Sequence, residues 1–334
     1  MDKRKPTLGE VREYLKKYNP LGLSGAMVDL FNEHNHLHYR LEKDGKVYCL
    51  RMINPETYRA GEWVEIAEEY VLLKRLENTG LGPKSYYVDP ERFILPLMIQ
   101  EFITDAICFK DFKPLAEQHL VAAAQAIALL NAQPINPDNF PFRERFTRYS
   151  YLTSVRTWRQ RLDVIKKYDQ EIRNYEGDVQ EWAKKIEAIV DRAEEKLKSF
   201  EPLLEKATWS FNFDGAHIGN TYWKDGKVMF LDWQKVSYGD PAFTLARFLT
   251  SVEPTGEVTD EIKEIMLEAY LRKREVAGFV GLLNRRFFER QIADLVWVVS
   301  NYVNERKAAS GQPLAKATSV TARYNRVKKI LEEY

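Results

Sequence analysis

The chain is poor in cysteine, has no long apolar run and carries no surplus of either charge. Cys49 and Cys108 are its only cysteines, and their separation lacks the spacing of a zinc site, as expected of free thiols in a reducing compartment. No stretch reaches the ~18 consecutive apolar residues of a membrane span. The charged start MDKRKPTLGE also lacks the apolar centre of a signal peptide. We therefore expect a cytoplasmic protein with no membrane partner.

The balance of charge limits the partners further. Lys and Arg number 50 against 49 Asp and Glu, a net charge of +1, whereas a nucleic-acid partner favours a basic surplus. We therefore expect no nucleic-acid partner. With 334 residues, of which 45% are hydrophobic, the chain exceeds the usual size of one domain and can bury a large core. These totals predict a protein of two lobes.

The first hundred residues indicate a small sheet with one helix packed on it. The segment TLGE at 7–10 has the form of a capping box, which predicts a short helix. Strand-like segments follow between 24 and 52, with Asp44-Gly45 as a hairpin turn. Residues 60–79 have the apolar spacing of an amphipathic helix. Two further strands are expected near 85–88 and 97–102. The sheet is predicted to be antiparallel.

The rest of the chain is predicted to be mostly helical. Residues 116–132 are apolar on almost every side, as in a helix buried in the core. The expected helices, with Gly177 as a break in the second, cover residues 116–132, 151–206, 240–252, 259–276, 281–307 and 315–333. A sheet followed by helices places the fold in the α+β class.

A short hairpin in the second half carries residues suited to phosphate chemistry. The segment FNFDGAHIGNTYWKDGKVMFLDWQ, residues 211–234, has Asp214 before one strand, Asn220 at the start of that strand and Asp232 after the returning strand. Transfer of a γ-phosphoryl group needs a carboxylate aimed at the attacking hydroxyl and a Mg²⁺ ion held by oxygen ligands. The pattern predicts Asp214 as the catalytic base and Asn220 and Asp232 as metal ligands.

The motifs around this hairpin resemble those of the aminoglycoside phosphotransferase and choline kinase-like family, relatives of the protein kinases. LDWQKVSYGDPAFTLARFL is similar to the family's metal-binding segment IDWE…GDPA.DLA, and AHIGN to the end of its catalytic loop HGDxHxGN. The resemblance extends over the chain. NHLHYRLEKDGKVYCLRM is similar to the opening strands, EEYVLLKRLENTGLGPKSYYVD to the helix and strand that follow, and LMIQEFI to the hinge.

The resemblance implies a protein-kinase-like bilobal fold. An N-terminal helical extension over 1–20 would precede a small antiparallel-sheet N-lobe over 21–103, which binds the nucleotide. A large, mainly helical C-lobe over 104–334 would hold the catalytic loop, the metal site and the acceptor pocket. The implied co-substrate is ATP or GTP with Mg²⁺, and the sequence does not decide between the two nucleotides.

The resemblance also assigns residues to the nucleotide. Arg51 stands where the family has the strand Lys or Arg that contacts the phosphates. Glu69 would be its helix partner, with Glu68 and Glu65 as alternatives. The hinge would present its backbone to the nucleobase, and Asn35 matches an Asn of the loop over the phosphates. The residues implied to bind the nucleotide are Arg51, Glu69, Asn35, Gln100, Glu101, Phe102 and Ile103.

Two departures from the family pattern concern the catalytic loop. Five residues separate Asp214 from Asn220 where the family has four. One alignment puts Gly215 at the catalytic position. The other, which we prefer, keeps Asp214 as the base, puts Asn212 in place of the usual His and uses the backbone freedom of Gly215 for a bulge. The second departure is Thr244, where the family has an Asp that braces this loop. Both leave catalytic competence open.

Several polar residues have more than one interpretation. His34, His36 and His38 alternate on one strand face and could suggest a metal site, but no acid or Cys completes one, so a polar loop over the phosphates is preferred. His217 lies within the catalytic loop and is interpreted as a bracing or substrate-facing residue. Near the C-terminus, one helix face carries three residues that could line the acceptor pocket or pack as a core helix with a polar rim: Trp297, Asn301 and Glu305.

The sequence therefore predicts a Mg²⁺-dependent phosphotransferase that moves the γ-phosphate of a nucleoside triphosphate to a hydroxyl of a small molecule. Two alternatives stay open. A pseudokinase-like nucleotide-binding or regulatory protein would explain the irregular catalytic loop. A kinase acting on Ser or Thr of a peptide would explain the long charged segment 151–206, which is also interpreted as a solvated helical insert. The identity of the acceptor is not predicted, because acceptor pockets vary independently of the fold.

Overall fold

The structure is a computed structural model in which residues 4–57, 65–140, 151–171, 177–252, 258–308 and 329 are described. It forms two compact units. Unit 1 comprises Met1–Phe146 and Phe213–Ser237, and unit 2 comprises Thr147–Asn212 and Tyr238–Tyr334. The antiparallel sheet near the N-terminus and the helices that follow confirm the α+β class. The predicted lobe bounds at 20 and 103 stay predictions.

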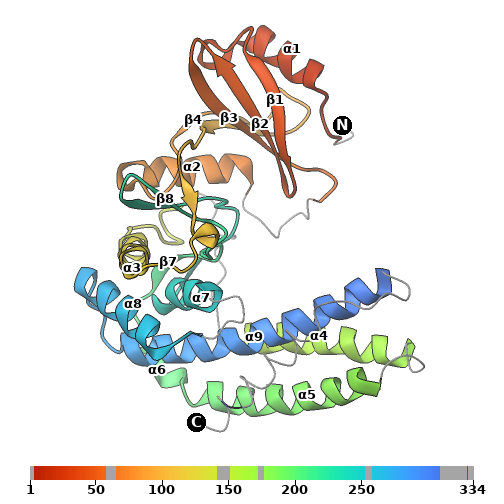
Figure 1. The fold of residues 1–334 in the computed structure, drawn as a ribbon, viewed down its shortest axis with the longest axis vertical. Coiled ribbons are helices and arrows are strands. Elements are labelled where there is room, and N and C mark those ends of the chain that lie inside the picture. The colour runs from red at the N-terminus through yellow and green to blue at the C-terminus, as the bar shows by residue number, and fades with distance from the viewer. Residues whose placement is uncertain are drawn as a thin grey trace. The chain divides into compact units, whose positions relative to one another are not determined.

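Unit 1 begins with a helix and a five-stranded antiparallel sheet (Figure 1). The sheet has the strand order β1-β2-β3-β5-β4. The elements are α1 (Leu8–Tyr18), β1 (Met27–Glu33), β2 (His36–Lys43), β3 (Lys46–Ile53), β4 (Ser85–Asp89) and β5 (Leu97–Glu101). The predicted capping box is formed, since the Thr7 side chain accepts from the Glu10 N–H at 3.2 Å. Asp44 and Gly45 have φ angles of 51° and 72°, the left-handed conformation that a tight two-residue hairpin requires.

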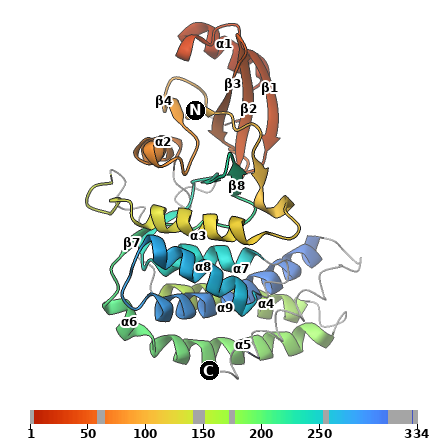
Figure 2. The same cartoon turned by 60° about the vertical axis from the view of Figure 1, so that its left-hand side comes forward.

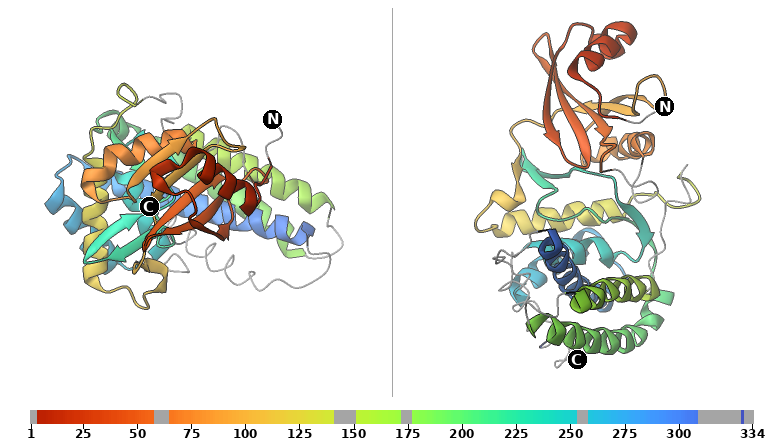
Figure 3. Two further views of the ribbon diagram at one scale, coloured as in Figure 1. Left: turned by 90° about the horizontal axis from the view of Figure 1, so that it is seen from above. Right: turned by 90° about the vertical axis from the view of Figure 1, so that its right-hand side faces the viewer.

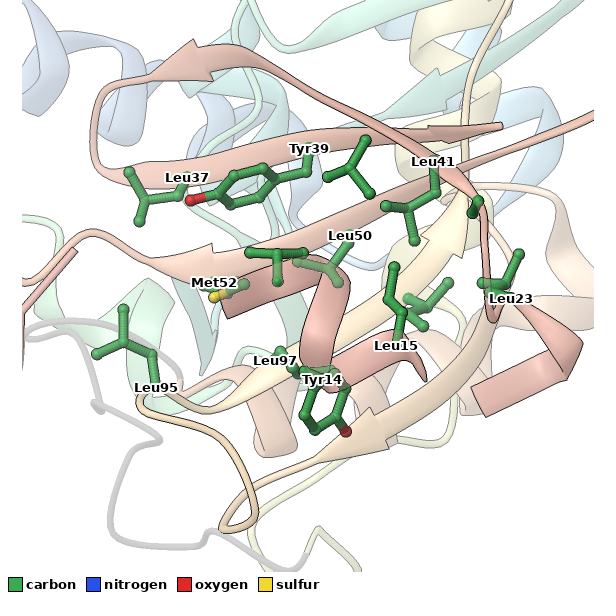
Figure 4. Packing of buried hydrophobic residues seen from close by; sticks show 14 residues of the cluster. Tyr14, Leu15, Leu23, Leu37, Tyr39, Leu41, Leu50, Met52, Leu95 and Leu97 are labelled. Carbon is green, nitrogen blue, oxygen red and sulfur yellow. The ribbon is translucent and has the colours of Figure 1, made fainter. Parts of the chain in front are cut away.

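One face of this sheet packs against α1, and the opposite face is polar. Along β2 and β3, alternate side chains point to opposite faces. The apolar set fills a core with Tyr14 and Leu15 of α1 (Figure 4). The buried members from the sheet strands and the segment before β5 are Val28, Leu37, Tyr39, Leu41, Leu50, Met52, Leu95, Leu97 and Ile99. The alternation therefore places His36, His38, Cys49 and Arg51 on the other face.

The remaining elements of unit 1 include a helix that packs near the sheet and a second, smaller sheet. They are α2 (Ile66–Leu76), β6 (Ile107–Cys108), α3 (Glu117–Asn131), β8 (Thr221–Lys224) and β9 (Lys227–Phe230), with short 3-10 turns at Glu77–Thr79 and Phe109–Asp111. The three-stranded sheet has the order β6-β8-β9. Asp225 and Gly226 form its hairpin turn with φ angles of 50° and 75°. This is the hairpin that the sequence predicts between Asn220 and Asp232.

The strands β7 (Ser210–Phe213) and β10 (Val236–Gly239) form a two-stranded sheet, and the division between the units passes through both strands. Neither strand was predicted, and β6 was not predicted either. Most of the predicted helix over 315–333 lies outside the described residues.

Unit 2 is helical. Its elements are α4 (Tyr151–Glu171), α5 (Gly177–Lys198), α6 (Glu201–Glu205), α7 (Ala242–Val252), α8 (Asp260–Lys273) and α9 (Phe279–Ala308). The helices α4, α5 and α9 lie side by side (Figure 2 and Figure 3) and share an apolar core around Trp158, Val190 and Ile292. Within the described part of the chain, no helix combines the length and apolar character needed to cross a bilayer.

Candidate active site

Arg51 of β3 links three elements of unit 1 through its guanidinium. Nη1 pairs with Glu69 Oε1 of α2, and Nη2 lies 2.8 Å from Oδ1 of Asp232, which follows β9. Arg51 is 2% exposed and Glu69 is fully buried. The Arg51 guanidinium, paired with one carboxylate on each side, thus fixes α2 and the segment after β9 to the sheet. Removing one partner of a buried ion pair leaves an uncompensated charge, so the loss of any of these side chains would be costly.

The structure selects Glu69 among the three candidate partners of Arg51. Glu68 is turned to the start of α2, where its Oε2 accepts from the Glu65 N–H at 3.0 Å. Burial raises the pKa of Glu69, and the Arg51 charge opposes that rise. The predicted ion pair is therefore present, while its function stays a prediction.

His36 is a third neighbour of the Arg51 guanidinium. Its ring nitrogens Nδ1 and Nε2 lie 3.1 and 3.3 Å from Arg51 Nη2, and Nδ1 lies 3.8 Å from Asp232 Oδ1. Burial, and after it the charge of Arg51, lowers the pKa of His36 far below its usual range, so the imidazole is neutral. Asn35 and His34, the residues before it, are exposed. The sequence pointed to this loop but not to the contact with Arg51.

Asp232 has a left-handed backbone, with a φ angle of 66°. This conformation is costly for residues other than Gly, Asn and Asp, and it often occurs at functional sites. Gln234 Nε2 donates to Asp232 Oδ2 at 2.9 Å. The neighbouring Trp233 is buried, donates to the Phe230 carbonyl at 2.9 Å and stacks on Phe213. The fixed indole holds the turn, so that the Asp232 carboxylate stays about one-third exposed (35%) beside Arg51.

Asn220 lies next to this turn. Its carbonyl accepts from the Leu231 N–H at 2.9 Å, and its Nδ2 donates to the Gly215 carbonyl at 3.2 Å. Asn220 and Asp232 thus supply one amide oxygen and one carboxylate from adjoining segments. Mg²⁺ prefers such oxygen ligands, and in phosphoryl-transfer sites it takes them together with substrate phosphates and water. The residues present therefore fit such an ion. In the described ranges, no three His, Cys, Asp or Glu side chains cluster as a metal site of their own.

Asp214 is fixed in the loop after β7. Its N–H donates to the Lys235 carbonyl at 3.0 Å, and its Oδ1 accepts from Ser237 Oγ at 2.9 Å. Gly215 does not take the left-handed conformation, so the expected use of its backbone freedom was wrong. A Cβ at this position would instead collide with the Phe213 ring, and the loop therefore needs glycine for space.

His217 braces the same loop. Its Nδ1 accepts from the Gly219 N–H at 3.1 Å, and its carbonyl accepts from the Asn220 N–H and from Thr221 Oγ1, both at 2.9 Å. These contacts match the bracing interpretation of His217.

Asn212 and Thr244, the two residues that depart from the family pattern, bond to each other. Thr244 Oγ1 donates to Asn212 Oδ1 at 2.9 Å, and Asn212 Nδ2 donates to the carbonyls of Ser210 and Asp240 at 3.2 and 3.1 Å. Asn212 and Thr244 are fully buried. In turn, the carboxylate of Asp240 pairs with Arg286 of α9. The end of β7 is thus anchored by neutral hydrogen bonds.

The predicted hinge residues lie at the end of the inner strand β5 and just after it. Gln100 is buried and lies opposite Cys49 in the β3–β5 register. Glu101 N–H donates to the Lys84 carbonyl at 2.8 Å. The Phe102 ring meets Phe31 of β1 edge-on with a centroid distance of 5.3 Å, and Phe31 is half exposed. The sequence interpretation missed Phe31, Gln234 and Ser237, since nothing in the local pattern singles them out.

The predicted acceptor residues lie in α9 of unit 2. Trp297 is 47% exposed, so the alternative of a tryptophan packed into the core was wrong. The side chains of Asn301 and Glu305 lie outside the described residues. Their relation to Trp297 stays a prediction.

Two comparisons with known proteins give matches, and the similar solved structures confirm the predicted kinase-like fold. A model of the phosphotransferase enzyme family matches residues 32–279. Comparison with curated proteins finds no match. Similar solved structures include the choline kinase from Cryptosporidium parvum Iowa II (14% identity, 98% of this chain and 97% of that one, TM-score 0.66). A second is the Plasmodium vivax ethanolamine kinase (14% identity, 96% of this chain and 87% of that one, TM-score 0.62). A third is a spectinomycin phosphotransferase in complex with ADP and spectinomycin (12% identity, 99% of this chain and 100% of that one, TM-score 0.64).

Proposed function

The chain belongs to the phosphotransferase enzyme family, and we propose that it transfers the γ-phosphate of ATP or GTP to a hydroxyl group of a small molecule with the help of Mg²⁺. The observation that carries this proposal is the buried connection from Glu69 through Arg51 to Asp232. It joins the sheet, α2 and the segment after β9 in one polar cluster, next to the loop that holds Asp214 and Asn220.

Each residue of this cluster has a role that its chemistry supports. Arg51 binds the phosphates, because a guanidinium offers several N–H donors to phosphate oxygens. Asp214 accepts the proton of the acceptor hydroxyl, or orients that hydroxyl for attack. Asn220 and Asp232 hold Mg²⁺, which when bound offsets the negative charge of the phosphates. Gln100, Glu101, Phe102 and Ile103 bind the nucleobase, and Asn35 lies over the phosphates.

The acceptor is proposed to be a small molecule. The similar structures carry the names of a choline kinase, an ethanolamine kinase and a spectinomycin phosphotransferase, and all three acceptors are small molecules. His217, Trp297, Asn301 and Glu305 are the proposed acceptor contacts. A cytoplasmic location follows from the reduced state expected of Cys49 and Cys108, which are free thiols and buried.

Two substitutions test the metal and the base separately. Asp232→Asn keeps the size of the side chain and suits a left-handed backbone, but it removes the carboxylate. We expect nucleotide affinity in the presence of Mg²⁺ to fall at least about tenfold and affinity without Mg²⁺ to change little. Asp214→Asn is expected to lower kcat by about 10²- to 10⁴-fold at unchanged nucleotide affinity. Calorimetric titration and a transfer assay over a panel of alcohols give both quantities.

Asp225→Asn is the matched control, since Asp225 forms the tip of the β8–β9 turn and Asn suits its left-handed φ. Full turnover by Asp214→Asn would remove Asp214 as the base, and unchanged Mg²⁺-dependent affinity in Asp232→Asn would remove the metal site. A second function, nucleotide binding without transfer, is favoured by the extra residue between Asp214 and Asn220. This second function would be supported if the protein bound nucleotide but gave no product with any acceptor in the panel. The panel includes a peptide with Ser and Thr.

A further inference from the structure

We propose that His36 is a positioning residue for Arg51, whose guanidinium it holds in place when Asp232 is engaged by a metal-bound nucleotide. This inference rests on the proposed function, since it assigns how the phosphate-binding side chain of that same site is kept in position. His36 was interpreted from the sequence only as part of a polar loop.

The guanidinium of Arg51 is surrounded by acceptors on two of its three nitrogens. Nη1 bonds Glu69, and Nη2 is shared between Asp232 at 2.8 Å and the ring nitrogens of His36 at 3.1 and 3.3 Å. Nε has no hydrogen-bond partner among the residues that the structure describes, although it is buried. Since an unpaired buried donor is costly, Nε is a donor for a ligand oxygen such as that of a phosphate.

The proposal follows from what happens to Nη2 when Asp232 changes partners. A carboxylate that ligates a metal ion offers less charge to its former hydrogen-bond donor. Arg51 would then be held by Glu69 alone, through one terminal nitrogen, and its other terminal nitrogen could turn away from the site. His36 removes this freedom because Nη2 keeps its contact with the imidazole ring. A lysine in place of Arg51 would have a single side-chain nitrogen, which Glu69 alone could hold. The second terminal nitrogen of arginine is the reason that a further contact, with His36, is needed.

The surroundings of His36 hold its ring beside the guanidinium. The residue begins β2, opposite Ile53 in the β2–β3 register, and is 2% exposed. Both ring nitrogens lie within 3.3 Å of Nη2, which two atoms of one imidazole allow only when Nη2 lies over the face of the ring. The guanidinium N–H therefore meets the π face of the ring, the side that attracts a cation. This contact does not depend on which ring nitrogen carries the proton.

The first test is a double-mutant cycle read by nucleotide affinity. His36→Leu keeps a side chain of similar volume without the ring, and His36→Phe restores a ring face. We expect His36→Leu to weaken binding of Mg²⁺ and a non-hydrolysable ATP analogue by about tenfold, and His36→Phe to stay within about threefold of the wild type. In an Arg51→Lys background, His36→Leu is expected to change affinity by less than about twofold. His119→Gln, a histidine that caps α3 by accepting from Ala116 N–H at 3.2 Å, is the control with unchanged affinity.

A second readout needs no nucleotide. Nuclear magnetic resonance of the Arg guanidinium groups in the ligand-free protein follows exchange of the Arg51 N–H protons with water, which we expect to speed up in His36→Leu and not in His36→Phe. Equal affinities and equal exchange in His36→Leu and wild type would overturn the inference, as would a loss of the same size in the Arg51→Lys background. If the wild type bound no nucleotide, the proposed function would fall, and the exchange rates would still decide whether His36 holds Arg51.

Discussion

His38 is a partly buried imidazole on the polar face of the N-terminal sheet. Burial, then the charges of Arg51 and His34, lowers its pKa from 6.5 to about 3. Its Nδ1 has no hydrogen-bond partner within the part of the chain that the structure describes. Between these two pKa values the unfolded chain binds a proton at His38 that the folded chain does not bind. The stability that the folded protein has with a neutral His38 is therefore fully present above pH 6.5. It is lost as the pH falls toward 3.

We expect this one group to lower the free energy of unfolding by up to about 1.4 kcal/mol for each pH unit below its unfolded pKa. Urea denaturation of the wild type and of His38→Asn at about pH 7.5 and about pH 5 measures the difference. The variant is expected to lose less stability on acidification than the wild type. His34→Asn, at an exposed neighbour, is the control, and a wild-type acid sensitivity retained in full by His38→Asn would contradict the prediction.

Some residue assignments depend on contacts that a sequence cannot display. The spacing of Glu65, Glu68 and Glu69 allowed any of them to face Arg51, and the choice is made because Glu68 bonds the backbone of Glu65 at the start of α2. The need for glycine at 215 comes from the ring of Phe213 two residues earlier, which no local rule reveals. By contrast, Arg51 and Asp232 could be identified in advance because their motif neighbours have characteristic types.

At the scale of secondary structure, the bond between β7 and α7 explains how this chain tolerates Asn212 and Thr244 where the family pattern has other residues. Asn212 at the end of β7 and Thr244 in the first turn of α7 replace a His and an Asp of the resembling motifs, and they bond to each other at 2.9 Å. Replacing both members of a pair can preserve a contact that either single change would break. The catalytic loop that begins two residues later therefore keeps a fixed origin.

We expect Thr244→Val to lower the free energy of unfolding by about 1–3 kcal/mol, because the buried Asn212 carbonyl loses a donor. The kcat is expected to fall while nucleotide affinity is retained, since Asp214 depends on this anchor and Arg51 does not. Asn212→Ala combined with Thr244→Val should cost less than the sum of the single changes, by about 0.5–3 kcal/mol. Denaturation and steady-state kinetics of the four proteins complete the cycle.

Thr250→Val in the same helix is the matched control, because the Thr250 hydroxyl donates to the Arg247 carbonyl of its own helix at 3.2 Å. Strictly additive energies in the cycle would show that Asn212 and Thr244 are not coupled, and the departures would then count against catalysis.

Elements with local signals could be predicted, and elements defined by distant pairing could not. The Asp44-Gly45 and Asp225-Gly226 turns were found because their left-handed residues have a strong residue preference. The strand β6 has two residues and pairs with β8 through Ile107 and Trp223. No periodicity exists in so short a segment, and its partner lies more than a hundred residues away in the sequence. The strands β7 and β10 have four residues each, which is also too short to show a periodicity.

At the scale of the whole molecule, the proposed nucleotide site is built from segments far apart in the sequence that all belong to unit 1. Arg51, Glu69, Asp214, Asn220 and Asp232 fall in Met1–Phe146 or Phe213–Ser237, whereas Trp297 falls in unit 2. Unit 1 includes the 213–237 segment, more than a hundred residues after Gln100. The Arg51–Asp232 pair joins this segment to the sheet, and the Arg51–Glu69 pair joins the sheet to α2. Binding of a nucleotide adds contacts to this cluster.

We therefore expect Mg²⁺ and a non-hydrolysable ATP analogue to slow hydrogen exchange in segments of unit 1 and to leave α4 and α5 of unit 2 nearly unchanged. A ligand at about 100 times its Kd stabilises the bound state by about 2.7 kcal/mol, which corresponds to about 100-fold slower exchange wherever opening releases the ligand. Mass spectrometry of exchange resolves the peptides that carry β3, α2 and residues 213–237.

Cys49 gives an independent measure in the same unit, because burial raises the pKa of its thiol to about 12 and alkylation therefore requires local opening. Its alkylation should slow in parallel with the exchange of β3 when the nucleotide binds, and the Asp232→Asn variant should lose this protection. Protection that appears in α4 and α5 but not in β3, α2 or the 213–237 hairpin would place the nucleotide outside the Arg51 cluster. The roles assigned to Glu69, Arg51 and Asp232 would then have no support, since all three depend on a phosphate bound beside that guanidinium.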